Sequence, residues 1–174
     1  FDKTDSKAAS EFIRSIGSAG YDFLLGIHVG AGKPPNRWPL EKFIQLVHRL
    51  NDTFKSRFYF TGSSADKEEI DYIRENLKFE AGYFIDRTIP EVAALAAKSD
   101  LFITNDTGIM HVAGATNTPQ ISIFGPTNPF NWAPVGKEKI FIRKSEFIDD
   151  ISVDEIFQMC QKILISKSHL LKKA

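Results

Sequence analysis

Two patterns of apolar residues alternate along this chain, and their alternation limits the folds that it can adopt. Short runs rich in β-branched and aromatic residues predict strands. These runs are residues 23–29, 57–61, 82–85, 101–104, 120–124 and 139–143, of which 82–85 is the weakest. The segments between them carry apolar residues at helical spacing. The alternation predicts an α/β fold in which helices flank both faces of a Rossmann-like parallel sheet.

Several of the helical segments carry recognisable start signals. Asp66 is followed three residues later by Glu69, and Thr88 is followed in the same way by Glu91. Such pairs are typical of a capping box at a helix start. Helices are also predicted at residues 8–16, 40–50 and 153–163.

The charges of the chain balance, which bears on its partners. Lysine and arginine together number 22, as do aspartate and glutamate. A chain without net charge has no global attraction for nucleic acid or for an anionic membrane surface. We therefore expect no nucleic-acid partner and at most peripheral membrane association. Any anionic ligand must be held by local geometry.

The sequence also bears on where the protein works. A single cysteine, Cys160, excludes an internal disulfide and suits a reducing compartment. No apolar stretch reaches the roughly 18 residues of a membrane span, and the polar N-terminus does not resemble a signal peptide. We expect a cytoplasmic location, which includes the inner face of the cytoplasmic membrane.

The chain does not begin with methionine, so we expect it to be part of a longer protein. Residues 1–22 are predicted to form a lead-in segment, with its helix, from a preceding domain. Residues 23–165 would form a Rossmann-like domain, and residues 166–174 a solvated tail.

Ligands of open parallel sheets bind beyond the carboxyl ends of the strands, which selects the loops to inspect. They are residues 30–38, 62–66, 85–88, 105–111 and 125–131. In the fourth of these loops Asn105, Asp106, Thr107 and Gly108 stand between a strand and a helix that begins near Thr107. Free amides at a helix start attract anions, and Gly108 lets a phosphate approach the backbone. The alternative is that Asp106 only caps the helix and His111 packs within it.

The first loop holds two glycines and three prolines around two basic residues. Its sequence from Gly30 is Gly-Ala-Gly-Lys-Pro-Pro-Asn-Arg-Trp-Pro, which places Ala31, Gly32, Lys33, Asn36 and Arg37 after the first strand. Lys33 and Arg37 are candidates for phosphate contacts. The loop matches neither a Walker loop nor Gly-x-Gly-x-x-Gly. The alternative is a basic surface loop in which Trp38 anchors the next helix.

Two further loops are open to either interpretation. Thr127 can donate to a phosphate or sugar hydroxyl, or can belong to an ordinary proline turn. Asp66, after Gly62, can accept from ribose hydroxyls or can simply cap a helix. The four histidines and one cysteine show no metal-ligand spacing, so we expect no metal and no cofactor.

Taken in order, these loops resemble a known family. The stretch from Gly30 to Pro39, the Thr-Gly pair at Gly62, Asn-Asp-Thr-Gly-Ile-Met-His at 105–111 and Phe-Gly-Pro-Thr at 124–127 are similar to the C-terminal domain of glycosyltransferase family nine. This family comprises the ADP-heptose:lipopolysaccharide heptosyltransferases and their relatives. The resemblance covers residues 26–164 and implies the C-terminal half of a GT-B fold.

The resemblance also implies roles for individual residues. Asp106 would bind sugar hydroxyls, and the amides of Thr107 and Gly108 would meet the pyrophosphate, with His111 close by. Asp66 would take the position of an acidic residue for the ribose. Arg87 and Thr88 would border the adenine.

The implied activity is an inverting, metal-independent transfer from an ADP-sugar, ADP-heptose in particular, to an acceptor of the lipopolysaccharide core or a related glycan. The acceptor and the general base would belong to the N-terminal domain, so no catalytic residue is assigned here and the fragment alone would be inactive. The family often has lysine where this chain has Asn36, and Lys33 or Arg37 would have to supply that charge.

Two alternatives stay open. One is a GT-B enzyme that uses a UDP-sugar. The other is a non-catalytic α/β interaction module, which the glycine-rich loops do not favour.

Overall fold

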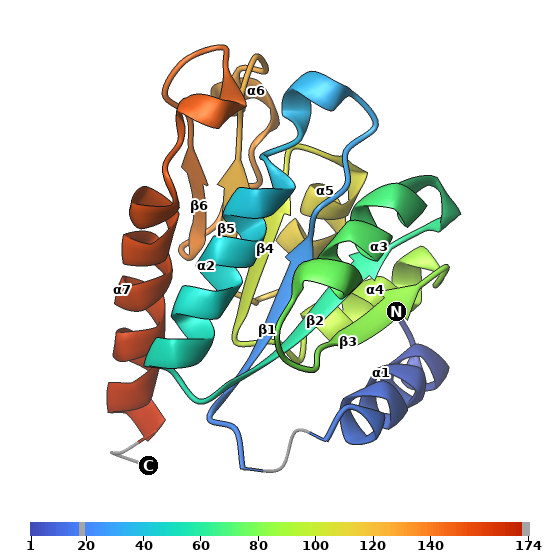
Figure 1. The fold of residues 1–174 in the computed structure, drawn as a ribbon. Helices are drawn as coiled ribbons and strands as arrows, with labels where there is room; N and C mark the ends of the chain where they lie inside the picture. The colour runs from blue at the N-terminus through green and yellow to red at the C-terminus, as the bar shows by residue number, and fades with distance from the viewer. Residues whose placement is uncertain (18–19, 172–174) are drawn as a thin grey trace.

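Six parallel strands form one sheet in the computed structural model, which describes residues 1–17 and 20–171. The strands are β1 (Phe23–His28), β2 (Ser56–Gly62), β3 (Gly82–Ile85), β4 (Leu101–Asn105), β5 (Gln120–Ile123) and β6 (Lys139–Ile142). Their order across the sheet is β3-β2-β1-β4-β5-β6, with every neighbouring pair parallel (Figure 1). The predicted Rossmann-like α/β fold is confirmed. The first and last residues of each strand lie within one residue of the predicted ones.

Helices cover both faces of this sheet (Figure 1). One face carries α2 (Leu40–Thr53), α3 (Lys67–Asn76) and α7 (Val153–Leu171). The other carries α1 (Lys3–Ser15), α4 (Ile89–Ala96) and α5 (Gly108–Gly114). The short helix α6 (Pro129–Trp132) and the turns η1 (Pro34–Asn36), η2 (Ser64–Asp66) and η3 (Ile148–Asp150) lie in connections between these elements.

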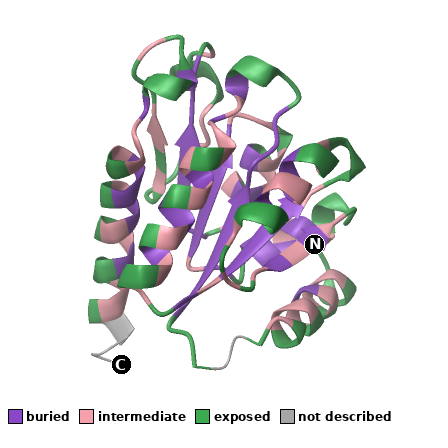
Figure 2. Cartoon of the chain, viewed as in Figure 1, coloured by how far each residue is buried: buried purple, intermediate pink, exposed green. Residues whose placement is uncertain are grey.

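The strands are buried on both faces, as helix-covered parallel strands must be (Figure 2). Leu25 and Ile27 of β1 point into the cluster under α2, α3 and α7 and are fully buried. Phe102 of β4 is equally buried in the second cluster, under α1, α4 and α5. Each such side chain contributes roughly 1.5–3 kcal/mol through burial. The sheet is therefore a rigid base for the loops at its edges.

The terminal helices are longer than the sequence pattern predicts. Helix α1 begins at Lys3, and its Ala9 is buried against the sheet face. Phe12 packs against Phe84 of β3 with ring centroids 4.8 Å apart. Helix α7 continues to Leu171, so the predicted tail is helical up to that residue; the last three positions of the tail lie outside the described residues.

The predicted helix start at Asp66 is confirmed in position, because Asp66 is the N-cap residue of α3, but the capping box predicted there is wrong. Asp66 does not cap α3 with its side chain, although the capping box at Thr88 and Glu91 is confirmed at the start of α4. Ser63 competes for the Asp66 carboxylate, because the two residues form a capping box of their own around η2. The chain therefore makes a short extra turn before α3 begins.

The strand order identifies the place where a ligand can enter. The chain leaves β1 toward α2 on one face and leaves the adjacent β4 toward α5 on the other. The two loops separate at this point, and a crevice opens between them at the carboxyl ends of the strands. Within the described part of the chain, no helix is both long and apolar enough to cross a bilayer.

Candidate functional site

A pocket of about 440 Å³ opens at the carboxyl ends of β1 and β2, beside the crevice. We call it the carboxyl-edge pocket. It is lined by His28, Ala31, Gly32, Thr61, Gly62, Ser63, Ala65, Asp66, Arg87, Ile89, Val92, Thr107, Gly108 and Ile109. Four loops that are far apart in sequence thus contribute to one wall.

The pocket gathers some of the predicted site residues and leaves others outside. Seven of the sixteen line it, namely Ala31, Gly32, Gly62, Asp66, Arg87, Thr107 and Gly108. The other nine are Gly30, Lys33, Asn36, Arg37, Thr88, Asn105, Asp106, His111 and Thr127. The local contacts of these nine differ.

Gly30 is held between two residues of the pocket wall. A Cβ atom at Gly30 would lie 2.0 Å from Asp66 Oδ1 and 3.3 Å from His28 Nε2. No side chain fits there unless Asp66 moves, because both distances are shorter than ordinary contacts. Gly30 therefore lets the Asp66 carboxylate rest against the β1 loop.

The loop that carries Asp66 is fixed by side-chain hydrogen bonds. The backbone N–H and the hydroxyl of Ser63 donate to Asp66 Oδ2 at 2.8 and 2.9 Å. The N–H of Ser64 donates to the carboxylate of Asp86 at 2.7 Å. Asp86 has a φ of 53°, a left-handed conformation that aspartate tolerates better than most residues. Asp66 is thus presented to the pocket on a constrained turn.

His28 is a pocket residue that the sequence interpretation missed. It ends β1, is only 4% exposed, and its Nδ1 lies 3.0 Å from both the carbonyl oxygen and the hydroxyl of Thr61. Burial lowers the pKa of His28 below its ordinary value of 6.5, while the Asp66 carboxylate and the Thr61 bond oppose that shift. His28 and Thr61 lie at the ends of β1 and β2, so the carboxyl-end rule is the signal that would have found them.

The far wall of the pocket combines a cation with apolar side chains. The Arg87 guanidinium lies over the Phe84 ring at 5.0 Å and 3.7 Å from the Glu91 carboxylate, and its side chain is about half exposed. Ile89, Val92 and Ile109 add apolar surface from α4 and α5. These apolar residues were also missed, because single apolar positions near helix starts carry no distinctive sequence signal.

The start of α5 meets the pocket at Thr107 and Gly108. Thr107 is the N-cap residue, and its side chain makes no capping hydrogen bond. A Cβ atom at Gly108 would meet nothing within 4 Å, and the same holds for Gly32. Neither glycine has a positive φ. Neither backbone strain nor packing therefore explains why glycine occupies these two positions.

Beside the pocket, three loops are joined through Asn36. Its amide donates to Asp106 Oδ2 at 3.1 Å and lies 3.5 Å from the Thr127 hydroxyl. Asp106 therefore does not cap α5, and His111 is exposed on that helix. The interpretation of this loop as a plain helix cap is wrong.

Asn105 is fully buried and bonded entirely to backbone. Its Oδ1 accepts from the Trp38 N–H at 3.1 Å, and its Nδ2 donates to the Val29 carbonyl at 2.7 Å and lies 3.5 Å from that of Gly30. Trp38 is also fully buried and donates from Nε1 to the Ile151 carbonyl. These bonds hold the β1 loop against the end of β4.

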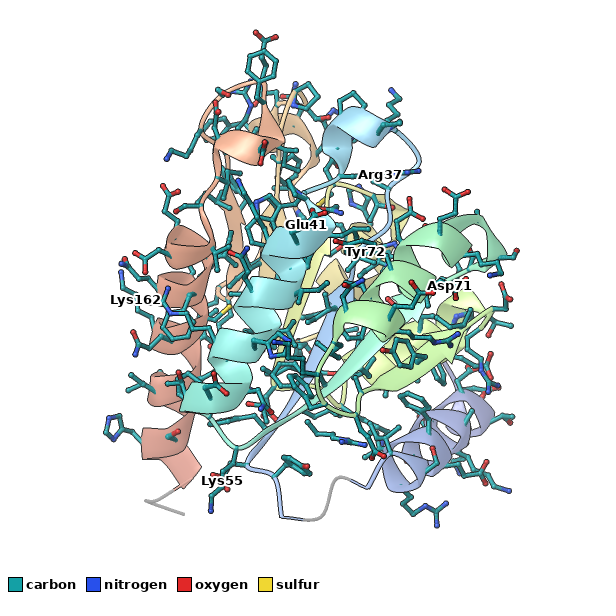
Figure 3. All side chains as sticks on the ribbon, viewed as in Figure 1. Arg37, Glu41, Lys55, Asp71, Tyr72 and Lys162 are labelled. Carbon is teal, nitrogen blue, oxygen red and sulfur yellow. The ribbon has the colours of Figure 1, made fainter. Side chains whose placement is uncertain are left out.

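The two basic residues of the β1 loop have different surroundings. Arg37 donates from Nη1 to Glu69 Oε1 at 2.5 Å and from Nε to the Ala31 carbonyl at 2.7 Å. In Figure 3 Arg37 lies in the upper part of the molecule, above Glu41 and Tyr72, while Lys55 lies near the bottom. Lys33 is exposed, and no hydrogen bond or ion pair involves its side chain among the described residues. Of the two, Lys33 is the one whose charge is not offset by a neighbour in the part of the chain that the structure describes.

Thr88 caps the N-terminus of its own helix, α4. Its hydroxyl and backbone N–H both donate to Glu91 Oε2 at 2.9 Å. Across residues 1–17 and 20–171, no three histidine, cysteine, aspartate or glutamate side chains gather as metal ligands.

Comparison with known proteins identifies the family. A family model described as glycosyltransferase family 9 (heptosyltransferase) matches residues 3–155. The chain belongs to glycosyltransferase family 9. The lipooligosaccharide heptosyltransferase 2 of Haemophilus influenzae is 31% identical over 147 residues, which cover 81% of this chain and 42% of that protein. This family 9 chain thus spans less than half the length of that relative.

Solved structures match the fold of this family 9 chain. A glycosyl transferase family 9 protein from Veillonella parvula aligns with a TM-score of 0.86 at 23% identity, over 95% of this chain and 53% of that one. The Escherichia coli heptosyltransferase WaaC, solved with ADP, aligns with a TM-score of 0.73 at 19% identity, over 89% and 48%. The present fold corresponds to about half of each.

Proposed function

We propose that this chain is the C-terminal, donor-binding half of a GT-B glycosyltransferase that uses an ADP-sugar, ADP-heptose in particular. The reaction would be an inverting, metal-independent transfer to an acceptor of the lipopolysaccharide core or a related glycan, at the cytoplasmic side of the membrane. The N-terminal half would supply the general base and most of the acceptor site. Family membership and the ADP bound by a relative of the same fold support this proposal.

The observation that carries the proposal is the pair of glycines in the pocket wall. Gly32 and Gly108 have ordinary backbone conformations and nothing within reach of an added Cβ. Glycine in a helix start or loop costs conformational entropy, and close approach of a ligand to the backbone is a use that offsets this cost. A diphosphate lying between the two loops would make that approach.

The remaining lining residues suit the other parts of a nucleoside diphosphate. Ile89, Val92 and Ile109 offer an apolar surface for a base, and Asp66 offers a carboxylate for ribose hydroxyls. Arg87 lines the pocket, and Lys33 extends from the adjoining loop with no other partner among the described residues. Departure of a nucleoside diphosphate builds negative charge, which preorganised amides and cations stabilise as it develops.

Asp106 is proposed to bind the transferred sugar. It lies outside the pocket and precedes Thr107 in the chain, and its carboxylate accepts a hydrogen bond from the Asn36 amide, which also lies 3.5 Å from the Thr127 hydroxyl. A carboxylate kept in place by one amide still has lone pairs for sugar hydroxyls. Asp106→Ala should therefore weaken binding of ADP-heptose and leave binding of ADP itself nearly unchanged.

Calorimetric titration of the 174-residue chain with ADP and UDP tests the proposal, with Gly108→Ala as the informative variant. Alanine in the first turn of α5 should raise the free energy of unfolding by about 0.5 kcal/mol, because it restricts the unfolded chain. The same methyl group should weaken ADP binding at least about tenfold, a penalty of roughly 1.4 kcal/mol. A variant that is more stable and yet binds worse separates ligand contact from folding.

Asn117→Ala is the matched control, because Asn117 is exposed just beyond the same helix. It should bind ADP like the unmodified chain. Absence of ADP binding would contradict the proposal, and stronger binding of UDP than of ADP would favour a UDP-sugar enzyme instead.

A further inference from the structure

The imidazole of His28 presents a lone pair toward the carboxyl-edge pocket. Its Nδ1 lies 3.0 Å from the Thr61 carbonyl oxygen, which accepts hydrogen bonds and cannot donate. The neutral ring therefore carries its proton on Nδ1, since a lone pair there would face the lone pairs of the carbonyl. Nε2 is left as an acceptor, and no hydrogen bond to it is found among the described residues. His28 lines the pocket and is otherwise buried.

A second unused acceptor lies beside it. Asp66 Oδ2 receives both hydrogen bonds from Ser63, which leaves Oδ1 without a protein donor among the described residues. Oδ1 and His28 Nε2 both lie within 3.3 Å of one point, the place where a Gly30 Cβ would be. The two acceptors are therefore close neighbours, and they come from different elements, β1 and η2.

Two adjacent acceptors in one pocket select a ligand with two adjacent donors. Neither atom can satisfy the other while both lack hydrogen, so water or a ligand must supply the donors. A vicinal diol carries two hydroxyl donors on neighbouring carbons. A cationic ligand fits less well, because the Arg87 guanidinium lines the same pocket.

We propose that His28 Nε2 and Asp66 Oδ1 together bind the 2′,3′-diol of a ribonucleotide, each accepting from one hydroxyl. This assignment rests on the proposed function and deepens it, because it makes His28 a specificity-determining residue for ribose over deoxyribose.

Titration with ADP, 2′-deoxy-ADP and 3′-deoxy-ADP tests the assignment. The unmodified chain should bind ADP about tenfold more tightly than either deoxy compound, because each lost hydroxyl leaves one acceptor unpaired. In His28→Asn the amide nitrogen keeps the donor to Thr61, and the Nε2 acceptor is lost. That variant should bind ADP about tenfold more weakly and should no longer discriminate against one of the two deoxy compounds.

Two further variants complete the design. His28→Gln places an amide oxygen near the former position of Nε2 and should restore discrimination against that compound. His48→Asn is the matched control, because His48 lies on α2 and lines a hollow with Asp52, Asn76 and Lys78, away from this pocket. It should bind all three nucleotides like the unmodified chain.

The possible failures are distinguishable. If the unmodified chain does not bind ADP, the proposed function fails and this assignment fails with it. If ADP binds but both deoxy compounds bind as tightly as ADP, only the diol assignment is overturned. It is also overturned if His28→Asn keeps both preferences while remaining folded by circular dichroism.

Discussion

Two groups of residues meet at the crevice between β1 and β4, and they differ in how their polar atoms are used. On the pocket side, His28 Nε2 and Asp66 Oδ1 have no hydrogen-bond partner among the described residues, and an added Cβ at Gly32 or Gly108 would meet nothing within 4 Å. On the loop side, Asn36 and Asn105 are bonded to each other's loops, and Arg37 is bonded to Glu69 on α3. Both groups include residues of the loops that follow β1 and β4.

The difference separates residues that bind from residues that position. Buried polar groups bonded to backbone fix a loop, and they cannot serve a ligand without giving up those bonds. Asn105 is the clearest example. Its side-chain amide is hydrogen-bonded to the backbone of the β1 loop, although Asn105 adjoins the proposed sugar contact Asp106. We therefore assign Asn105 and Arg37 to positioning, and the pocket residues to binding.

The largest expected effect tests that assignment at Asn105. Asn105→Ala would leave the Trp38 N–H and the Val29 carbonyl unpaired in a fully buried place. Unsatisfied buried groups cost about 1–3 kcal/mol each, so the free energy of unfolding should fall by about 3 kcal/mol. Urea unfolding followed by circular dichroism measures this loss.

Asn131→Ala is the control, since Asn131 is exposed on α6. Its unfolding free energy should change by less than about 0.5 kcal/mol. An Asn105→Ala protein of normal stability that nevertheless fails to bind ADP would contradict the positioning role and would make Asn105 a ligand contact.

A smaller effect distinguishes the two basic residues of the β1 loop. Arg37→Ala should lower the unfolding free energy by about 1–2 kcal/mol, because Glu69 is only 8% exposed and would lose its partner. This loss in unfolding free energy is smaller than that expected for a fully buried pair, because the Arg37 side chain is 35% exposed to solvent. Lys33→Ala should leave stability unchanged and weaken ADP binding about threefold, most clearly at low salt.

Lys67→Ala serves as the control for Lys33, because Lys67 is exposed on α3 and pairs with Asp71 on the same helix. The comparison fails if Arg37→Ala is as stable as the unmodified chain. It fails also if Lys33 and Lys67 have the same effect on ADP binding.

Local patterns were sufficient to predict the strands and the main helices of the fold. The strands were found because β-branched and aromatic runs such as the one at residues 57–61 are bounded by turn residues. The capping box at Thr88 was found because its two partners are three residues apart. The carboxyl-end rule then selected the loops that form the pocket.

Contacts between distant segments were not predictable from the same patterns. Asn36 and Asp106 are 70 residues apart, and Trp38 and Asn105 are 67 apart. No periodicity records which side chain will meet which. A lone histidine such as His28 looks like an ordinary core residue in sequence, and only the placement of Thr61 and Asp66 around it shows that one nitrogen remains free.

The smallest expected effect is a dependence of stability on pH that reports on His28. Burial lowers its pKa in the folded chain, whereas in the unfolded chain the pKa stays near 6.5. Below pH 6.5 the unfolded state therefore binds more protons than the folded state. As the pH is lowered from 6.5, the unfolding free energy decreases until the pH is below the pKa of His28 in the folded chain. The contribution is fully present above pH 6.5.

The capping glutamates do not account for a loss in that window. Glu91 and Glu155 also have lowered pKa values, because each accepts hydrogen bonds from its capping partner, but their ordinary value of 4.5 places their contributions at lower pH. Urea unfolding between pH 5 and pH 8 should therefore show a slope that His28→Asn flattens and His48→Asn does not. A slope that persists unchanged in His28→Asn would assign the titration to another histidine. It would also leave the pocket side without the neutral imidazole that distinguishes it from the loop side.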